Sequence, residues 1–216
     1  ALSASNDQLS KELAALRNEL YRLKKRNKNK PKAAPADGQT DFSVLGITTK
    51  AKRILIVTDL SGSMSSWSKT LVETLLEIIE PFHEKIQFAI IGYQGVGVTQ
   101  YWPVRGRMAV ADARSKADAR RFIHRIPRLV DGTTPTQSAL LRALKYKPDA
   151  IILVSDGEPT DEESLAILER ITKLNKRRIE INTVAVGDYL SHSKLVTFLN
   201  DLAKKNRGKF VGVLND

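Results

Sequence analysis

Oxygen-bearing side chains that follow a predicted strand carry the clearest chemistry of this sequence. Asp59, Ser61 and Ser63 stand in the pattern Asp-x-Ser-x-Ser. The apolar run 54–57 comes just before them and is typical of a buried strand. In open α/β sheets, ligands bind at the carboxyl ends of the strands. Because one carboxylate and two hydroxyls suit a hard cation, the pattern predicts a site for an ion such as Mg²⁺.

Two later segments supply further oxygen ligands. The apolar run 150–154 predicts a second buried strand, which leads through Ser155 to Asp156 and a glycine. Between the two predicted strands lies the turn-rich loop 131–136, Asp-Gly-Thr-Thr-Pro-Thr, just ahead of a helical pattern over 139–144. The loop adds hydroxyls to the carboxylates at the strand ends.

These three motifs resemble those of the von Willebrand factor type A (vWA) domain family. The family's Asp-x-Ser-x-Ser corresponds to residues 59–63, and its distal aspartate corresponds to Asp156. Its loop threonine corresponds to Thr134, because residues 132–135 match the usual Gly-Gly-Thr-Pro with Thr133 in place of the second glycine. A shift of the loop by one residue would make Thr133 the ligand instead. The resemblance covers about residues 50–216 and implies an intact metal-ion-dependent adhesion site formed by Asp59, Ser61, Ser63, Thr134 and Asp156.

The resemblance also implies how a metal would be held. The three hydroxyls would contact the cation, and the two aspartates would hold it largely through bound waters. Mg²⁺ keeps several waters in such sites, and Mn²⁺ or Ca²⁺ are alternative cations. An Asp or Glu of a partner protein could displace one of these waters. Loops around Trp67, Tyr93–Gln94 and 158–160 are expected to form the rim that sets specificity. The simpler alternative is that the first motif only caps the helix that follows it.

The size and composition of the chain exclude several classes of protein. Its 216 residues suffice for one domain and an appendage, and the absence of cysteine excludes disulfides and thiolate metal sites. No apolar run approaches the roughly 20 residues that cross a membrane. The first residues, 1–5, would suit the mature side of a signal-peptide cleavage. Together with the adhesion-type site, this favours an extracytoplasmic location (cell surface, envelope or periplasm) over a cytoplasmic one.

The N-terminal segment predicts a helix with a leucine seam over residues 1–26. Its leucines are spaced 4-3-4-3, as at the a and d positions of a coiled coil: Leu9, Leu13, Leu16, Leu20 and Leu23. Such a narrow apolar stripe favours self-association into a homo-oligomer, and the alternative is an amphipathic helix that packs on its own domain. Of the net charge of +11, +6 falls within residues 1–35.

A basic linker rich in Pro, Ala and Gly is predicted over residues 27–49. A solvated spacer is the simplest interpretation of this segment. The sharper one is a contact with an anionic surface such as anionic lipid. Because no aromatic residue stands among its charges, nucleic-acid binding is not favoured.

Residues 50–216 alternate between strand and helix patterns, which predicts a Rossmann-like α/β fold: a doubly wound, mostly parallel sheet flanked by helices. The predicted helices are 67–79, 111–126, 136–146, 161–176 and 194–205. The predicted strands are 54–57, 86–91, 150–154, 181–187 and 210–213, with a short edge strand near Pro103.

An enzymatic function is not favoured. In phosphatases of the haloacid dehalogenase type, an Asp at a strand end is the nucleophile and a second carboxylate two residues later is the general acid. Ser61 occupies that second position here and cannot exchange a proton as a tuned carboxylic acid does. We therefore expect a non-enzymatic domain that binds an acidic side chain of a protein partner through a divalent cation. The alternative is a structural subunit of a homo-oligomeric surface or envelope assembly, in which the metal is structural.

Overall fold

The computed structural model describes residues 42–104 and 106–214. The chain divides into two units, Ala1–Gln39 and Thr40–Asp216, and all described residues belong to the second, which is compact. The predicted helix over 1–26 and most of the predicted linker over 27–49 lie outside the described residues. Self-association through that helix therefore stays a prediction.

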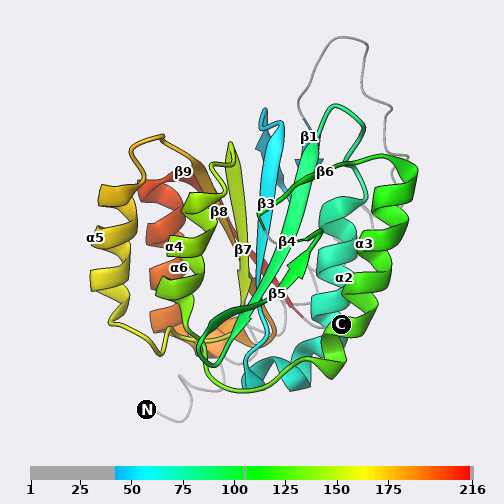
Figure 1. Cartoon of the computed structure of the whole chain (residues 1–216). Coiled ribbons are helices and arrows are strands. Elements are labelled where there is room, and N and C mark those ends of the chain that lie inside the picture. The colour runs from blue at the N-terminus through cyan, green and yellow to red at the C-terminus, as the bar shows by residue number, and fades with distance from the viewer. Residues whose placement is uncertain (1–41, 105, 215–216) are drawn as a thin grey trace, which may run out of the picture. The chain divides into compact units, whose positions relative to one another are not determined.

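A seven-stranded sheet forms the centre of the second unit, in the order β5-β4-β3-β7-β8-β9 with β6 beside β4 (Figure 1). Its strands are β3 (Arg53–Asp59), β4 (Gln87–Gln94), β5 (Gly97–Trp102), β6 (Ala109–Val110), β7 (Ala150–Ser155), β8 (Glu180–Val186) and β9 (Arg207–Val213). Five of them run parallel, whereas β5 and β6 pair with β4 in the antiparallel direction. The predicted mostly parallel sheet is confirmed.

Helices cover both faces of this sheet. On one face lie α2 (Ser68–Ile79) and α3 (Ala113–Arg125), and on the other lie α4 (Thr136–Lys145), α5 (Ser164–Leu174) and α6 (Ser193–Lys205) (Figure 1). Short 3₁₀ turns are η1 (Gly62–Trp67), η2 (Ile126–Arg128) and η3 (Tyr189–Ser191). Along β3, Ile54 and Ile56 pack toward α2 and α3, whereas Leu55 and Val57 pack toward α4, α5 and α6. Because both faces are covered, this strand is apolar throughout instead of alternating.

The strand order reverses between β3 and β7. From β3 the chain continues to β4 on one side, and it later places β7 on the other side of β3. The two strands are adjacent and parallel, with Thr58 opposite Val154. The crevice outside the carboxyl ends of such a pair is where doubly wound sheets bind ligands. The polar residues that follow β3 and β7 are therefore brought to one place.

The end of the predicted linker has a defined structure. Residues 42–49 contain β1 (Phe42–Val44) and β2 (Ile47–Thr49), which pair as an antiparallel hairpin. Val44 and Ile47 are buried in the same apolar cluster as α2 and α3. Two apolar side chains on a short hairpin are thus enough to attach this part of the segment to the core.

The start of α5 differs from the prediction for a specific reason. The sequence predicts a helix from residue 161, but α5 begins at Ser164. The carboxylate of Asp161 accepts the backbone N–H groups of Gln137 and Ser138, at 3.0 and 2.8 Å. Asp161 therefore satisfies the first turn of α4 instead of starting its own helix. None of the helices described is both long and apolar enough to cross a membrane.

Candidate metal centre

Three loops at the carboxyl edge of the sheet bring the predicted ligands together. The first begins at Asp59, the last residue of β3, and continues through Ser61 to Ser63 in η1, and the second follows β7 and carries Asp156. The third precedes α4 and carries Thr134. We call these five residues the oxygen cluster.

Asp59 lies at the base of the oxygen cluster and is fully buried. Its Oδ1 accepts the backbone N–H of Ser61 at 2.9 Å, and its Oδ2 accepts the hydroxyl of Ser155 at 2.6 Å. Burial raises the pKa of Asp59 from 3.8 to about 6, although the Ser155 and Ser61 hydrogen bonds favour the carboxylate. The protein thus fixes both oxygens of this carboxyl group, and no Lys or Arg among the residues that the structure describes forms an ion pair with it.

Ser61, Ser63 and Asp156 form a continuous chain of contacts. The hydroxyls of Ser61 and Ser63 lie 3.1 Å apart, and Ser63 donates its hydroxyl to Asp156 Oδ1 at 2.9 Å. Burial raises the pKa of Asp156, while the Ser63 hydrogen bond acts in the opposite direction. Ser61 and Asp156 are buried, whereas Ser63 is exposed. The cluster is therefore open to solvent on the side of Ser63.

Thr134, and not Thr133, borders the other hydroxyls. A Cβ atom added to Gly157 would lie 3.5 Å from Ser63 Oγ and 3.6 Å from Thr134 Oγ1, so both hydroxyls face the same side of this glycine. The Thr134 backbone is held by Thr160, whose hydroxyl accepts its N–H at 2.9 Å. The hydroxyl of Thr133 instead donates to the carbonyl of Gly95 at 3.2 Å, in the turn between β4 and β5.

The sequence did not reveal the roles of two residues that lie beneath the cluster. Ser155 donates to Asp59, and the only signal for it was its place between an apolar run and Asp156. Tyr93 is fully buried on β4, and its hydroxyl lies 3.4 Å from that of Thr136. Burial, and then the nearby Asp59 carboxylate, raises the pKa of Tyr93. The prediction that Tyr93 forms part of an exposed rim is wrong, because its ring fills the core beneath the site.

A cavity of about 320 Å³ opens beside the oxygen cluster. Its lining residues are Ser63, Trp67, Asp156, Gly157, Glu158, Asp188 and His192. Trp67 packs on Gly187, where a Cβ atom would lie 2.6 Å from the indole ring and φ is +85°. Only glycine avoids both problems at this position. Trp67 and Glu158 both line this cavity, and their role in specificity stays a prediction.

The chemistry of the oxygen cluster fits a hard divalent cation. All five side chains offer oxygen atoms as ligands. Among residues 42–104 and 106–214, neither Asp59 nor Asp156 forms an ion pair with a Lys or Arg. The same residues contain no group of three or more His, Cys, Asp or Glu side chains that could hold a metal. Any cation here would therefore depend on hydroxyls and water as well as on the two carboxylates.

Comparisons with known proteins agree with this architecture. A family model described as the von Willebrand factor type A domain matches residues 52–211. Inter-alpha-trypsin inhibitor heavy chain H4 of Homo sapiens is 28% identical over 183 residues, which cover 77% of this chain and 19% of that protein. The chain thus spans about a fifth of the length of this curated relative.

Two solved structures share the fold at low sequence identity. The pilus adhesin SpaC from Lactobacillus rhamnosus GG is 15% identical with a TM-score of 0.54, over 74% of this chain and 28% of that one. The N-terminal domain of TFIIH p34 is 16% identical with a TM-score of 0.52, over 74% of this chain and 89% of that one. At these identities the likeness concerns the fold alone.

Proposed function

The chain belongs to the von Willebrand factor type A domain family, whose members generally mediate protein–protein interaction, and from this premise we propose that it binds its partner through a divalent cation. The cation, Mg²⁺ in the first place, would be held by Asp59, Ser61, Ser63, Thr134 and Asp156. The partner would supply an Asp or Glu side chain to the metal.

The convergence of two buried carboxylates that form no ion pair with a Lys or Arg of the described residues carries this proposal. Removing a carboxylate from water is costly unless its charge is compensated. Asp59 and Asp156 are both buried, and the pKa of each is raised. A bound divalent cation would compensate both charges, and it would explain why the fold maintains this arrangement.

The openness of the cluster supports a binding role for the metal. Hydroxyl ligands are neutral, so they leave a divalent ion able to attract a further anionic oxygen. Ser63 is exposed and the neighbouring cavity reaches Asp156, so an acidic side chain could approach from solvent. When bound, the cation would supply positive charge at this position, and the surrounding loops would select the partner.

Binding, and not catalysis, is the activity that we propose. A nucleophilic Asp59 would need a free oxygen and access to substrate. Both of its oxygens accept hydrogen bonds and the residue is fully buried.

An extracytoplasmic location and homo-oligomerisation through residues 1–26 remain further proposals. Fractionation of cells would test the location. Light scattering of a chain without residues 1–26 would test the homo-oligomerisation.

Calorimetric titration of Mg²⁺ and Mn²⁺ into the EDTA-treated protein tests the metal site. We expect saturable one-site binding that the Asp156→Ala variant loses. Glu162→Ala is a matched control, because Glu162 is an exposed acid that follows the same strand but lies outside the oxygen cluster. Unchanged binding in Asp156→Ala, or none in the unmodified chain, would contradict the proposal.

A further inference from the structure

The amino edge of the sheet, opposite the oxygen cluster, concentrates exposed positive charge. It combines the starts of β3 and β9, the ends of α4, α5 and α6, and the loop between α5 and β8. Its exposed basic residues, which we call the basic edge, are Lys52, Arg53, Lys145, Lys147, Lys173, Lys176, Arg177, Arg178, Lys204, Lys205, Arg207 and Lys209. Residues 36–216 carry a net charge of only +5, so the remainder of that part of the chain is acidic overall.

Hydrogen bonds hold these segments together as one surface. Across the strand starts, the N–H of Asp149 donates to the carbonyl of Arg53 at 2.8 Å, and the N–H of Glu180 donates to the carbonyl of Asp149 at 3.0 Å. The ends of α5 and α6 are joined by the side chains of Asn175 and Asn206, at 2.9 Å. The backbone segments that carry the basic edge are therefore held in a fixed arrangement.

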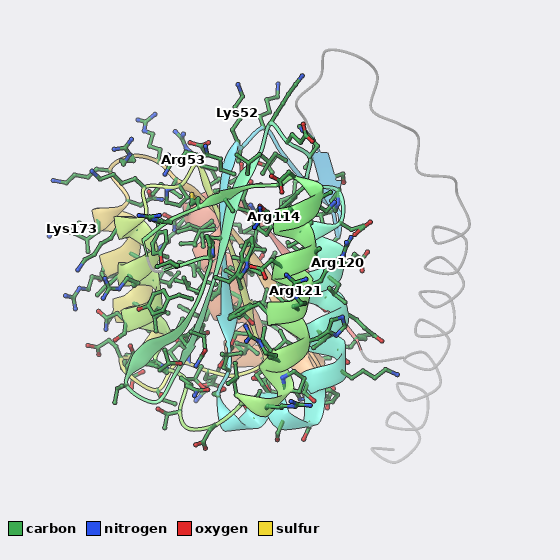
Figure 2. All side chains as sticks on the ribbon, turned by 45° about the vertical axis from the view of Figure 1, so that its right-hand side comes forward. Lys52, Arg53, Arg114, Arg120, Arg121 and Lys173 are labelled. Atoms are coloured by element: carbon green, nitrogen blue, oxygen red, sulfur yellow. The ribbon has the colours of Figure 1, made fainter. Side chains whose placement is uncertain are left out.

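The basic edge is not neutralised by acidic neighbours. The ion pairs among the described residues join Arg120 to Glu80 and Arg121 to Asp118, on the flank of α3, whereas Lys52 and Arg53 lie at the end of the sheet (Figure 2). None of these ion pairs includes a residue of the basic edge.

The two acids among the strand starts are already occupied by neutral donors. The carboxylate of Asp149 accepts the backbone N–H groups of Lys52 and Arg53. The carboxylate of Glu180 accepts the hydroxyl of Thr49 and the amide of Asn182.

Helix stabilisation explains only part of this concentration of charge. Basic residues in the last turn of a helix interact favourably with its dipole, which accounts for Lys145, Lys173, Lys204 and Lys205. It does not account for the bases at the strand starts or for the run Lys176, Arg177 and Arg178. These residues repel one another, so their gathering at one edge indicates a ligand of opposite charge.

We infer that the basic edge docks on an anionic lipid membrane. The charge distribution favours a plane over a polymer, because the opposite edge exposes acids, among them Asp131, Glu158 and Asp188, that a planar anionic surface repels. Leu174 adds an apolar element, since it is 48% exposed between Lys173 and Lys176. An apolar side chain among basic ones is typical of surfaces that rest on lipid headgroups.

Docking in this orientation would place the oxygen cluster on the side away from the lipid. A seven-residue strand spans roughly 20 Å, so the two edges are separated by more than the ionic screening length of about 8 Å. The membrane contact itself is independent of the proposed metal-dependent function. Only the idea that docking presents the oxygen cluster to a partner rests on that proposed function.

Vesicle co-sedimentation of the full chain in EDTA tests the inference. The vesicles contain phosphatidylcholine and phosphatidylserine in equal parts, and pure phosphatidylcholine vesicles serve as the reference. The variant Lys176→Glu/Arg177→Glu/Arg178→Glu should bind the anionic vesicles at least about a hundredfold more weakly, because each cation contributes roughly a fivefold factor. Lys204→Glu/Lys205→Glu/Lys209→Glu, on a different part of the basic edge, should show the same loss.

The matched control reverses the same number of charges at the other edge. Lys69→Glu/Arg128→Glu/Lys194→Glu changes exposed bases near the oxygen cluster and should keep vesicle binding within about threefold, since these charges are screened from the membrane. Mg²⁺ binding by the basic-edge variants should equal that of the unmodified chain, which separates this inference from the proposed function.

Equal vesicle binding by edge and control variants would overturn the inference. So would equal binding to pure phosphatidylcholine, or tighter edge-dependent binding to a short DNA duplex at the same salt.

Discussion

The two edges of the sheet use charged residues in opposite ways. At the carboxyl edge, Asp59 and Asp156 are buried and each makes a defined hydrogen bond to a hydroxyl. At the amino edge, the residues of the basic edge are exposed and form no ion pair with another described residue. The energy of a buried charge depends on each neighbouring group individually, whereas exposed charges act on a ligand through their combined electrostatic field. Single substitutions should therefore have large effects at the first edge and small effects at the second.

The largest effect is expected for Asp59→Asn. The variant should bind Mg²⁺ at least about a hundredfold more weakly, because it loses a buried anionic ligand. Without metal, it should be more stable than the unmodified chain at neutral pH, by on the order of 3 kcal/mol, because an uncompensated buried carboxylate is removed. Urea unfolding in EDTA, together with calorimetry, measures both changes.

The pH dependence identifies the cause of that stability difference. The pKa of Asp59 is raised in the folded chain from 3.8 to about 6, so between these values the folded state binds more protons than the unfolded state. Stability in EDTA should therefore fall as pH rises from about 4 through 6, and Asp59→Asn should lack this part of the fall. An exposed control, Asp131→Asn, should follow the unmodified chain. A stability gain in Asp59→Asn that persists at pH 4 would contradict this explanation.

A smaller effect is expected for Ser155→Ala, which tests whether the hydroxyl beneath the site positions Asp59. Loss of the 2.6 Å hydrogen bond should weaken Mg²⁺ binding about tenfold, as loss of a residue that orients a metal ligand does. Because this hydrogen bond favours the carboxylate, the pKa of Asp59 should rise further. The pH at which half of the Mg²⁺ affinity is lost should move upward.

A purely structural role for Ser155 would lower stability without moving that pH midpoint. Ser138→Ala, at an exposed serine of α4, should change neither the affinity nor the midpoint. An unchanged midpoint in Ser155→Ala would show that Asp59 is positioned by other contacts.

The placement of Asp59 and Asp156 at one edge of the sheet could be predicted from the sequence, because each residue follows directly from a single strand. Asp59 and Asp156 stand at the ends of two apolar runs, and the parallel pairing of β3 with β7 brings those ends together. The supporting residues were harder to predict. Tyr93 has the pattern of a rim residue in a loop, but β4 extends to Gln94 and carries its side chain into the core. Asp161 stands where a helix should begin, but it caps α4 across space.

The basic edge could not be predicted in the same way. Its residues come from six separate segments, and in the sequence each is an ordinary basic residue near a helix end or a strand start. The helices run opposite to the strands, so the helix ends and the strand starts lie at one edge. Only this arrangement shows that the separate basic residues add up to one positively charged surface (Figure 2). Much of the net positive charge of the sequence falls within residues 1–35, and this hides the charge separation within the domain.

The smallest effect is expected for neutralising two charges of the basic edge, in Lys176→Gln/Arg177→Gln. Both side chains are exposed and surrounded by like charges, so the free energy of unfolding should change by no more than about 0.5 kcal/mol. At low salt the free energy of unfolding should rise slightly, because repulsion among the charges of the basic edge is reduced. This gain in stability should disappear as added salt screens that repulsion. Urea unfolding at low and high ionic strength measures this change. A loss of more than about 1 kcal/mol would mean that these charges stabilise the fold, and the contrast between the two edges would then fail.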